Sequence, residues 1–227
     1  MRHFVIGVLL VLALALPLVL VAPPTVPAED DCKIVEDFSH AQVGEFPAEW
    51  KARKEAGKDV YAVHEDGGKR FLRAMSKGLG IQAAREVQGW DLTTYPMLAW
   101  SWRPREFPRG ADEREASRND SVLAVYVLVP HSRIAGPKAV KYIWSEKVAV
   151  GTHLASNHGL TQVRVLRSGS DGRGEWRHEK VNVLEDYRTF FDAKESPKPI
   201  GIAVLTDADE TKSSAAGDYA EFKICRK

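Results

Sequence analysis

PIGIAVLTDADETKSSAAGDYAEFK, the stretch Pro199–Lys223, decides the fold of this chain. Its pattern predicts a strand, an acidic loop and a second strand. Small or apolar residues occupy both alternating sets of positions in 200–206, so we expect this strand to be covered on both faces and central in a sheet. The strand ends in Asp207, Asp209 and Glu210. A rigid strand that delivers several carboxylates to one loop commonly builds a cation or polar-ligand site.

Strand-like segments fill most of the remaining chain. They are residues 33–38, 60–64, 71–75, 80–87, 98–103, 121–129, 140–145, 162–167 and 176–183. Gly67 and Gly68 predict a tight hairpin turn, and the glycine-rich residues 168–175 predict a hairpin loop between the last two segments. About ten short strands separated by turns favour an all-β fold, an antiparallel β-sandwich or jelly roll, over an alternating α/β fold.

One helix is predicted, over Val183–Phe191, with Asn182 as its N-cap and Glu185 closing a capping box. Its apolar stripe consists of Leu184, Tyr187 and Phe191. Of the six tryptophans, Trp100 and Trp102 alternate on one strand and are expected in the core. Tryptophans far more often fill cores than stack on sugars at a surface, and Trp50, Trp90 and Trp144 are the candidates for exposure.

Residues 1–28 have the three parts of a secretory signal peptide: a basic start, an apolar run over 4–22 and small residues up to Ala28. The run is long enough to span a bilayer, so an uncleaved anchor is the alternative, but Pro17 and the prolines that follow the run favour cleavage. We therefore expect an exported protein, periplasmic or secreted, with a single domain over residues 29–227 and no membrane span after cleavage.

The charge balance disfavours a nucleic-acid partner. Removing residues 1–28 takes away Arg2 and leaves 31 basic and 31 acidic residues, scattered among one another. Phosphate binding needs a basic face, which this pattern does not predict.

The two cysteines, Cys32 and Cys225, stand at the two ends of the expected domain. In an exported protein such a pair is expected to be bridged, which would make the terminal strands neighbours; two separate thiols are the alternative. Their spacing lacks the paired C-x-x-C pattern of a zinc site.

Several motifs resemble a bacterial exported family catalogued as domain of unknown function 3047. They are EDF (36–38), LRA (72–74), YIW (142–144), VLRSG (165–169), Trp176 with Glu179, NVLEDYRTFF (182–191) and GIAVLTDADET (201–211). Glu210 and Val181 depart from the family pattern, which more often has Asn and Arg there. The resemblance implies export and a single domain and carries no activity; more coarsely, the layout is similar to galactose-binding and other carbohydrate-binding sandwich modules.

The acidic loop supplies the candidate metal site, with Asp207, Asp209 and Glu210 as hard oxygen ligands for calcium and Asp218 nearby. The alternative is a solvated turn whose aspartates cap backbone amides. Glu179 could join Asp207 across the sheet as a catalytic carboxylate pair, or form a structural charge pair with Arg164 or Lys180.

Trp176 and His178 are expected on the strand face opposite Glu179. His153 and His158 lie in a predicted loop and could be metal ligands or a general base, or merely hydrated.

The leading functional hypothesis is a binder of a saccharide or another polar cell-envelope ligand. Its expected ligand contacts are Asp207, Asp209, Thr211, Trp144 and Glu179. The alternatives are a polysaccharide-active hydrolase or lyase that uses paired carboxylates, and a structural envelope protein.

Overall fold

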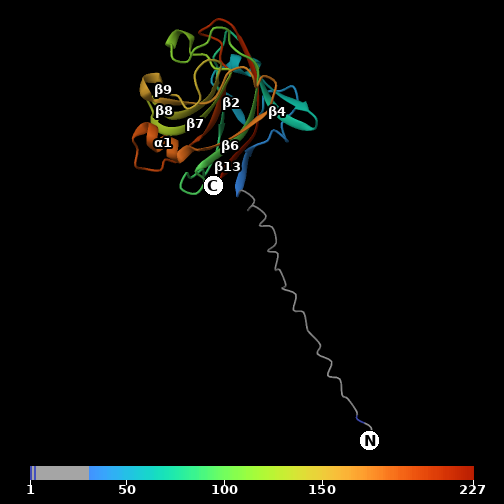
Figure 1. The fold of residues 1–227 in the computed structure, drawn as a ribbon. Coiled ribbons are helices and arrows are strands. Elements are labelled where there is room, and N and C mark those ends of the chain that lie inside the picture. Colours follow the sequence, from blue (N-terminus) through green and yellow to red (C-terminus); the bar gives the residue numbers. More distant parts are fainter. Residues whose placement is uncertain (2, 4–30) are drawn as a thin grey trace.

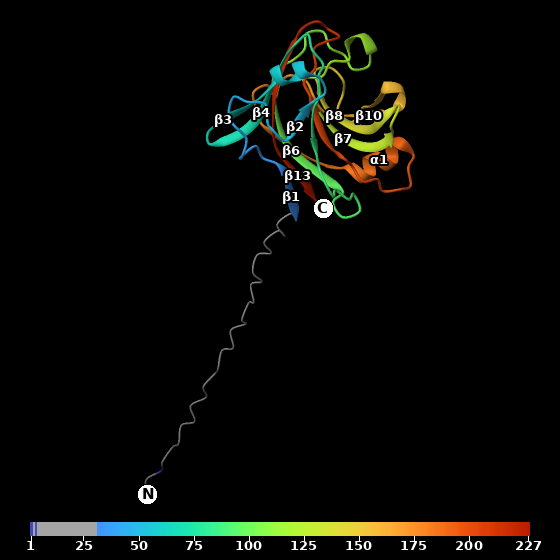
Figure 2. The same cartoon turned by 180° about the vertical axis from the view of Figure 1, so that it is seen from behind.

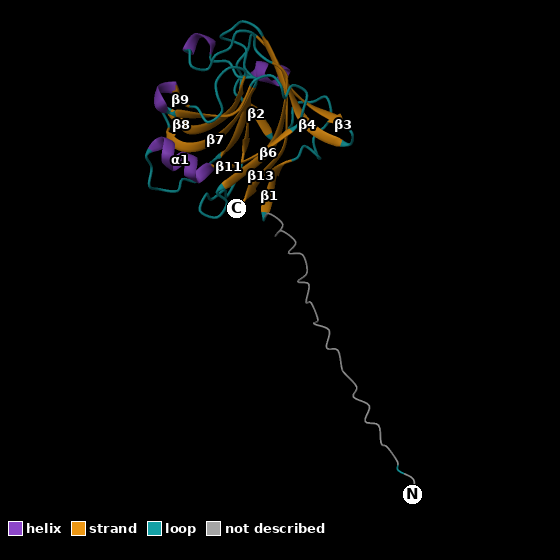
Figure 3. Cartoon of the chain, in the orientation of Figure 1, coloured by secondary structure: helices purple, strands orange, loops and turns teal. Residues whose placement is uncertain are grey.

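Two β-sheets pack face to face in the computed structural model, which describes Met1, His3 and residues 31–227 (Figures 1 and 3). The six-stranded sheet contains β11 (Arg177–Asn182), β6 (Met97–Glu106), β13 (Ser214–Cys225), β4 (Lys69–Lys77) and β3 (Tyr61–Asp66) in that order, with β1 (Cys32–Glu36) also beside β13. The seven-stranded sheet contains, in order, β2 (Trp50–Ala52), β5 (Ala83–Glu86), β12 (Gly201–Leu205), β7 (Leu123–Ser132), β8 (Gly136–Ser145), β10 (Thr161–Ser168) and β9 (His153–Ser156). The predicted β-sandwich class is confirmed.

Three 3₁₀ turns interrupt the connections: η1 (Glu55–Asp59), η2 (Ala116–Arg118) and η3 (Asn157–Gly159). The hairpin β3–β4 and the helix α1 (Val183–Phe191) lie at opposite sides of the sandwich in both views (Figure 2).

Within residues 31–227, strand pairing is antiparallel with one exception, the parallel pair β8 and β10. The predicted β3–β4 hairpin is confirmed, with Gly67 and Gly68 at positive φ in its turn. The prediction of a second hairpin across residues 168–175 is wrong, because β10 belongs to the seven-stranded sheet and β11 to the six-stranded one. The glycines marked a turn correctly, but local sequence does not tell whether the next strand returns beside the last or crosses to the other sheet.

β12 is central, as its sequence predicts. It pairs with β5 on one edge and β7 on the other, and all five of its residues are buried. Gly201 is required at the close approach to β5, since a Cβ there would lie 2.2 Å from the Arg85 carbonyl oxygen. β12 therefore ends at a rigid position, from which Asp207 follows.

Aromatic rings join the two sheets through the core. Trp100 and Trp102 of β6 pack edge to face, and they contact Tyr142 and Trp144 of β8 with ring centroids 5.7 and 6.0 Å apart. The three candidates for exposure, Trp50, Trp90 and Trp144, are all buried, so none offers a surface ring. Each is large enough that the apolar contact available in the core outweighs a surface position.

The helix α1 has the predicted bounds, and the Asn182 side chain accepts a hydrogen bond of 3.1 Å from the Glu185 backbone N–H. Tyr187 is buried and packs against Phe191, with ring centroids 4.9 Å apart. Asp186 accepts hydrogen bonds from the Tyr142 hydroxyl and the Arg164 guanidinium, which tie the helix to β8 and β10.

Cys32 and Cys225 form a disulfide between β1 and β13, which confirms both the bridge and the neighbouring terminal strands. The predicted signal peptide, residues 1–28, falls almost wholly outside the described residues. Among the residues that are described, no helix has the length and apolar character needed to cross a membrane.

Candidate functional site

A cleft of about 500 Å³ opens on the face of the six-stranded sheet that points away from the other sheet. Five of its residues come from neighbouring strands or their ends: Phe71, Ser101, Trp176, His178 and Glu221. Charged residues of the β3–β4 hairpin and the turn after β1 complete it: Asp37, Glu65, Asp66, Lys69 and Arg70. Phe71 and Ser101 alternate with the core residues Leu72 and Trp102 and therefore face outward.

Two aromatic rings form an apolar platform in this cleft. Trp176 and Phe71 meet edge to face with ring centroids 5.5 Å apart. Phe71 is buried, whereas Trp176 is partly exposed. Because the other five tryptophans are buried, Trp176 is the indole that is accessible to a ligand in the described structure.

A charged cluster supports the platform from beneath. The Arg103 guanidinium carbon lies 4.5 Å from the Trp176 ring centroid and 5.2 Å from that of Phe71. The fully buried Asp218 carboxylate accepts hydrogen bonds of 2.8, 2.8 and 2.6 Å from Nε of Arg73, Arg103 and Arg105. Charge-assisted contacts of this kind are strong and directional, so they hold the stacked guanidinium in place.

The expectation that Asp218 lies near the acidic loop is thereby corrected. Its position on β13 directs it to the outer face of the six-stranded sheet, between Arg73 and Arg103.

Three polar side chains form a chain of hydrogen bonds beside the platform. The Ser101 hydroxyl oxygen lies 2.6 Å from Glu221 Oε2 and 2.7 Å from His178 Nδ1. The hydrogen bond from Ser101 holds the pKa of Glu221 below its usual range, so this carboxylate is ionised at neutral pH and can only accept. Ser101 therefore donates to Glu221, and His178 Nδ1–H donates to Ser101.

This order differs from that of a serine-hydrolase triad, in which the histidine stands between the serine and the carboxylate. Here the serine is in the middle and is buried, so it is not a nucleophile. The arrangement instead fixes the tautomer of the neutral imidazole: His178 Nε2 is left as an acceptor on a side chain that is 74% exposed.

An irregularity in β13 sets the orientation of the Glu221 side chain. The register with β6 shifts between Ala220 and Lys223, and Glu221 has a φ of 58°. A non-glycine residue in this region costs roughly 1–3 kcal/mol, and such strain and such bulges occur preferentially at functional sites.

A second polar group, the acidic cluster, is formed by Asp120, Asp207 and Asp209. One carboxylate oxygen from each lies within 4.8 Å of the other two. Asp120 accepts hydrogen bonds from the Glu210 N–H, the Thr211 N–H and the Thr211 hydroxyl. The burial of Asp207 raises the pKa of its carboxyl well above the usual range.

Residues 48–223 match the family described as "Protein of unknown function (DUF3047)". The chain belongs to the DUF3047 family. No curated protein matches it.

Some solved structures are similar to the DUF3047 chain. The family 11 carbohydrate-binding module of a cellulosomal cellulase from Clostridium thermocellum is 7% identical, with 88% of this chain and 97% of that chain covered and a TM-score of 0.43. Endoglucanase 3 of family GH12 from Trichoderma harzianum is 9% identical, with 87% and 97% covered and a TM-score of 0.41. Two sheets of paired strands define the β-sandwich of this chain.

The predicted site residues of the DUF3047 chain lie apart. Glu179, on β11, accepts hydrogen bonds from Trp102 Nε1 and from Arg167, whereas Asp207 follows β12 in the other sheet. Glu179 therefore forms a structural charge pair with Arg167, while Arg164 pairs with Asp186. The buried Trp144 donates from its indole N–H to the Gly169 carbonyl and offers no stacking face.

In the acidic loop, Asp207 and Asp209 come together as expected, but Glu210 is exposed and Asp120 takes its place. Thr211 donates hydrogen bonds from its backbone N–H and its hydroxyl to the Asp120 carboxylate. Asp120 lies about ninety residues earlier in the chain, and its only sequence signal is its position at the entry to the apolar strand 121–129.

The predicted loop histidines separate. His153 belongs to β9, where Nε2 lies 2.7 Å from Gln162 Oε1 and the ring stacks on Phe190 with centroids 4.2 Å apart. His158 lies in η3 at a φ of 53°. The acidic cluster is the one group of potential metal ligands among the described residues, and it contains no histidine.

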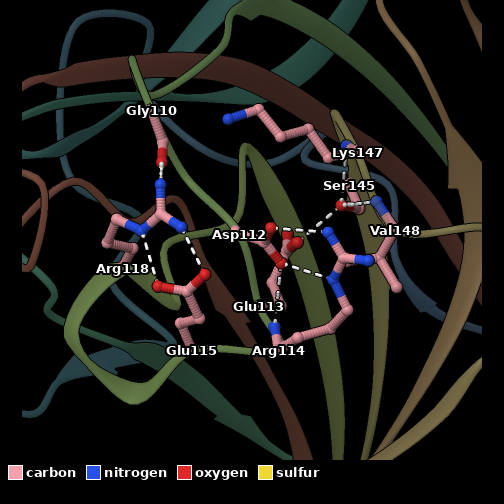
Figure 4. Close-up of polar contacts among 9 residues, drawn as sticks. All are labelled: Gly110, Asp112, Glu113, Arg114, Glu115, Arg118, Ser145, Lys147 and Val148. Carbon is pink, nitrogen blue, oxygen red and sulfur yellow. Dashed lines mark hydrogen bonds and ion pairs between the residues drawn. The ribbon is translucent and has the colours of Figure 1, made fainter.

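Asp120 lies at the end of the charged connection between β6 and β7. Ion pairs within this connection stabilise its conformation (Figure 4). Asp112 pairs with Arg114, and Glu115 pairs with Arg118. Glu113 reaches β8, where it accepts a hydrogen bond of 2.5 Å from the Ser145 hydroxyl. The connection is thus fastened to the seven-stranded sheet just before Asp120.

Proposed function

We propose that this DUF3047 protein binds a saccharide in the cleft on the six-stranded sheet. The observation that carries the proposal is the juxtaposition of the partly exposed Trp176 ring with the chain of hydrogen bonds through His178, Ser101 and Glu221. A pyranose ring has an apolar face and a rim of hydroxyls, so it needs an aromatic surface with acceptors and donors at its edge.

The polar groups fit a ligand whose hydroxyls both donate and accept. His178 Nε2 and the Glu221 carboxylate accept, while Lys69 and Arg70 donate. Arg70 is already paired with Glu65 at 2.8 Å. Because carboxylates outnumber cationic side chains around the cleft, a neutral sugar fits better than an acidic one.

Binding is favoured over hydrolysis as the role of this cleft. The separation of Glu179 from Asp207 on different sheets leaves that carboxylate pair without a common substrate. The buried Ser101 hydroxyl is held between His178 and Glu221 and orients both side chains. This arrangement supports a role in positioning a ligand.

We place this binding outside the cytoplasm, in a single domain over residues 29–227 that meets a cell-envelope saccharide. The disulfide between Cys32 and Cys225 supports an oxidising compartment. The signal-peptide pattern of residues 1–28 also supports export.

A panel of neutral and acidic polysaccharides tests the proposal by affinity electrophoresis and calorimetry. We expect retention by at least one neutral glycan and a loss of at least about tenfold in affinity for Trp176→Ala, equivalent to about 1.4 kcal/mol. Met75→Ala is the matched control, because Met75 is 55% exposed on β4 and does not line the cleft. Absence of binding to every glycan, or equal binding by Trp176→Ala, would contradict the proposal.

A further inference from the structure

We propose that Asp120, Asp207 and Asp209 bind a divalent cation, with calcium as the ion. One ligand oxygen from each of the three carboxylates lies within 4.8 Å of the others. Carboxylate oxygens are the hard ligands that calcium takes at 2.3–2.6 Å, and oxygens on one such ion are separated by distances of this size.

An unpartnered oxygen points to the same ion independently of the clustering. Asp207 is only 6% exposed, and its Oδ1 is buried with no hydrogen-bond partner among the described residues. A buried carboxylate oxygen without a donor is strongly unfavourable, so such groups are normally paired or coordinate metals. A cation shared with Asp209 supplies the missing partner.

Gly80 provides the space that the two carboxylates occupy. A Cβ at this position would lie 2.6 Å from Asp207 Oδ1 and 2.8 Å from Asp209 Oδ1. Any other residue would displace the ligand oxygens, although the φ of Gly80 is not in the region that itself requires glycine.

The third carboxylate is rigidly placed. Asp120 is fully buried, and its hydrogen bonds from the Thr211 N–H and hydroxyl, at 2.8 and 2.5 Å, fix its direction. Each carboxylate oxygen has more than one lone pair, so these bonds leave capacity for a cation.

The ion would join two separate segments of chain, the loop after β12 and the residues just before β7. A backbone hydrogen bond from Asp207 N–H to the Ser121 carbonyl already connects them, and one from Ala208 N–H to the Leu79 carbonyl holds the loop beside Gly80. A cation at their meeting point offsets the repulsion among three carboxylates and fastens the loop after β12 to the start of β7.

Thermal unfolding and calorimetric titration of the full chain, stripped of metal with a chelator, test this site. We expect binding of one calcium ion per chain and a rise in Tm of roughly 5–10 °C at a hundredfold excess over Kd. Asp207→Asn and, separately, Asp209→Asn should abolish both. Glu210→Gln, the matched control, removes a neighbouring exposed carboxylate outside the cluster and should keep both.

Two results would overturn the proposal. One is a wild-type chain that binds no calcium and melts identically in calcium and in chelator, as expected if the buried aspartates share a proton. The other is a calcium response that persists in both asparagine variants, which would place the ion elsewhere. Because the wild-type titration needs no variant, a variant that fails to fold does not obscure the outcome.

Discussion

The hydroxyl oxygen of Ser101 lies 2.6 Å from Glu221 Oε2, although the two residues are 120 positions apart in the sequence. This contact joins β6 to the bulge of β13 and orders a line of polar groups that ends at His178. It also explains how a strained backbone at Glu221 can be part of a site: the strain directs the carboxylate to a buried donor at the cleft.

Ser101→Ala removes that donor and should weaken saccharide binding by about three- to tenfold, because the His178 tautomer is no longer fixed. Unfolding free energy should fall by about 1–3 kcal/mol, since Glu221 and His178 both lose a partner. Ser76→Ala is the matched control: it also removes a buried serine hydrogen bond, to the Leu79 carbonyl, but outside the cleft. Equal glycan affinities of the two variants would show that Ser101 has only a structural role.

Replacement of both Cys32 and Cys225 by serine should lower the unfolding free energy by about 2–5 kcal/mol. The bridge closes a loop of 193 residues, so its loss releases a large conformational entropy in the unfolded chain. Denaturant unfolding under oxidising conditions measures the loss, and a thiol assay on the unfolded, unreduced wild type should find no free thiol. Two titratable thiols in the wild type would contradict the bridge.

Tyr187→Ala should cost about 3 kcal/mol or more, because it empties a buried aromatic position between α1 and the core. The exposed Thr189 on the same helix provides the comparison, and Thr189→Ala should change stability by no more than about 0.5 kcal/mol. If both substitutions have similarly small effects in urea unfolding, the helix does not contribute to the core through this side chain.

The free energy of unfolding of the wild type, measured relative to that of Glu113→Gln, should fall as the pH rises from about 4 to 7. Burial raises the pKa of Glu113 above its unfolded value, so the folded state favours the protonated form and loses this contribution as the pH passes through the folded pKa.

Asp112→Asn should show the opposite slope. The hydrogen bond from Arg114 lowers the pKa of Asp112 to about 2, so the contribution of this carboxylate is present above its unfolded pKa and is lost as the pH falls. Unfolding curves across pH 2–7 give both slopes, and slopes of the same sign would refute this assignment.

Periodicity was sufficient for much of the fold. Both faces of β12 are apolar in the sequence, and the strand is buried on both faces; Asn182 and the stripe through Tyr187 predicted the helix boundaries. These features succeed because they depend on contacts close in sequence or on burial alone.

The site needed information that periodicity does not contain. Trp144 resembles other strand tryptophans in its pattern, and only the packing against Trp102 shows that it belongs to the core. Asp120 and Ser101 reach their partners by strand pairing over about ninety and 120 residues. The alternation that places Trp176 and His178 on one side of the predicted strand 176–183 was the one local signal for the cleft, but neither residue was assigned to a ligand from the sequence.

The behaviour of the Trp176 indole tests the central claim most directly. In a ¹H–¹⁵N spectrum the chain should give six indole signals, of which five belong to buried rings and one, identified by its absence in Trp176→Phe, belongs to the cleft. Titration with a retained neutral glycan should shift that signal in a saturable manner and leave the other five nearly unchanged. A saturating glycan that leaves the Trp176 signal in place would contradict binding in this cleft.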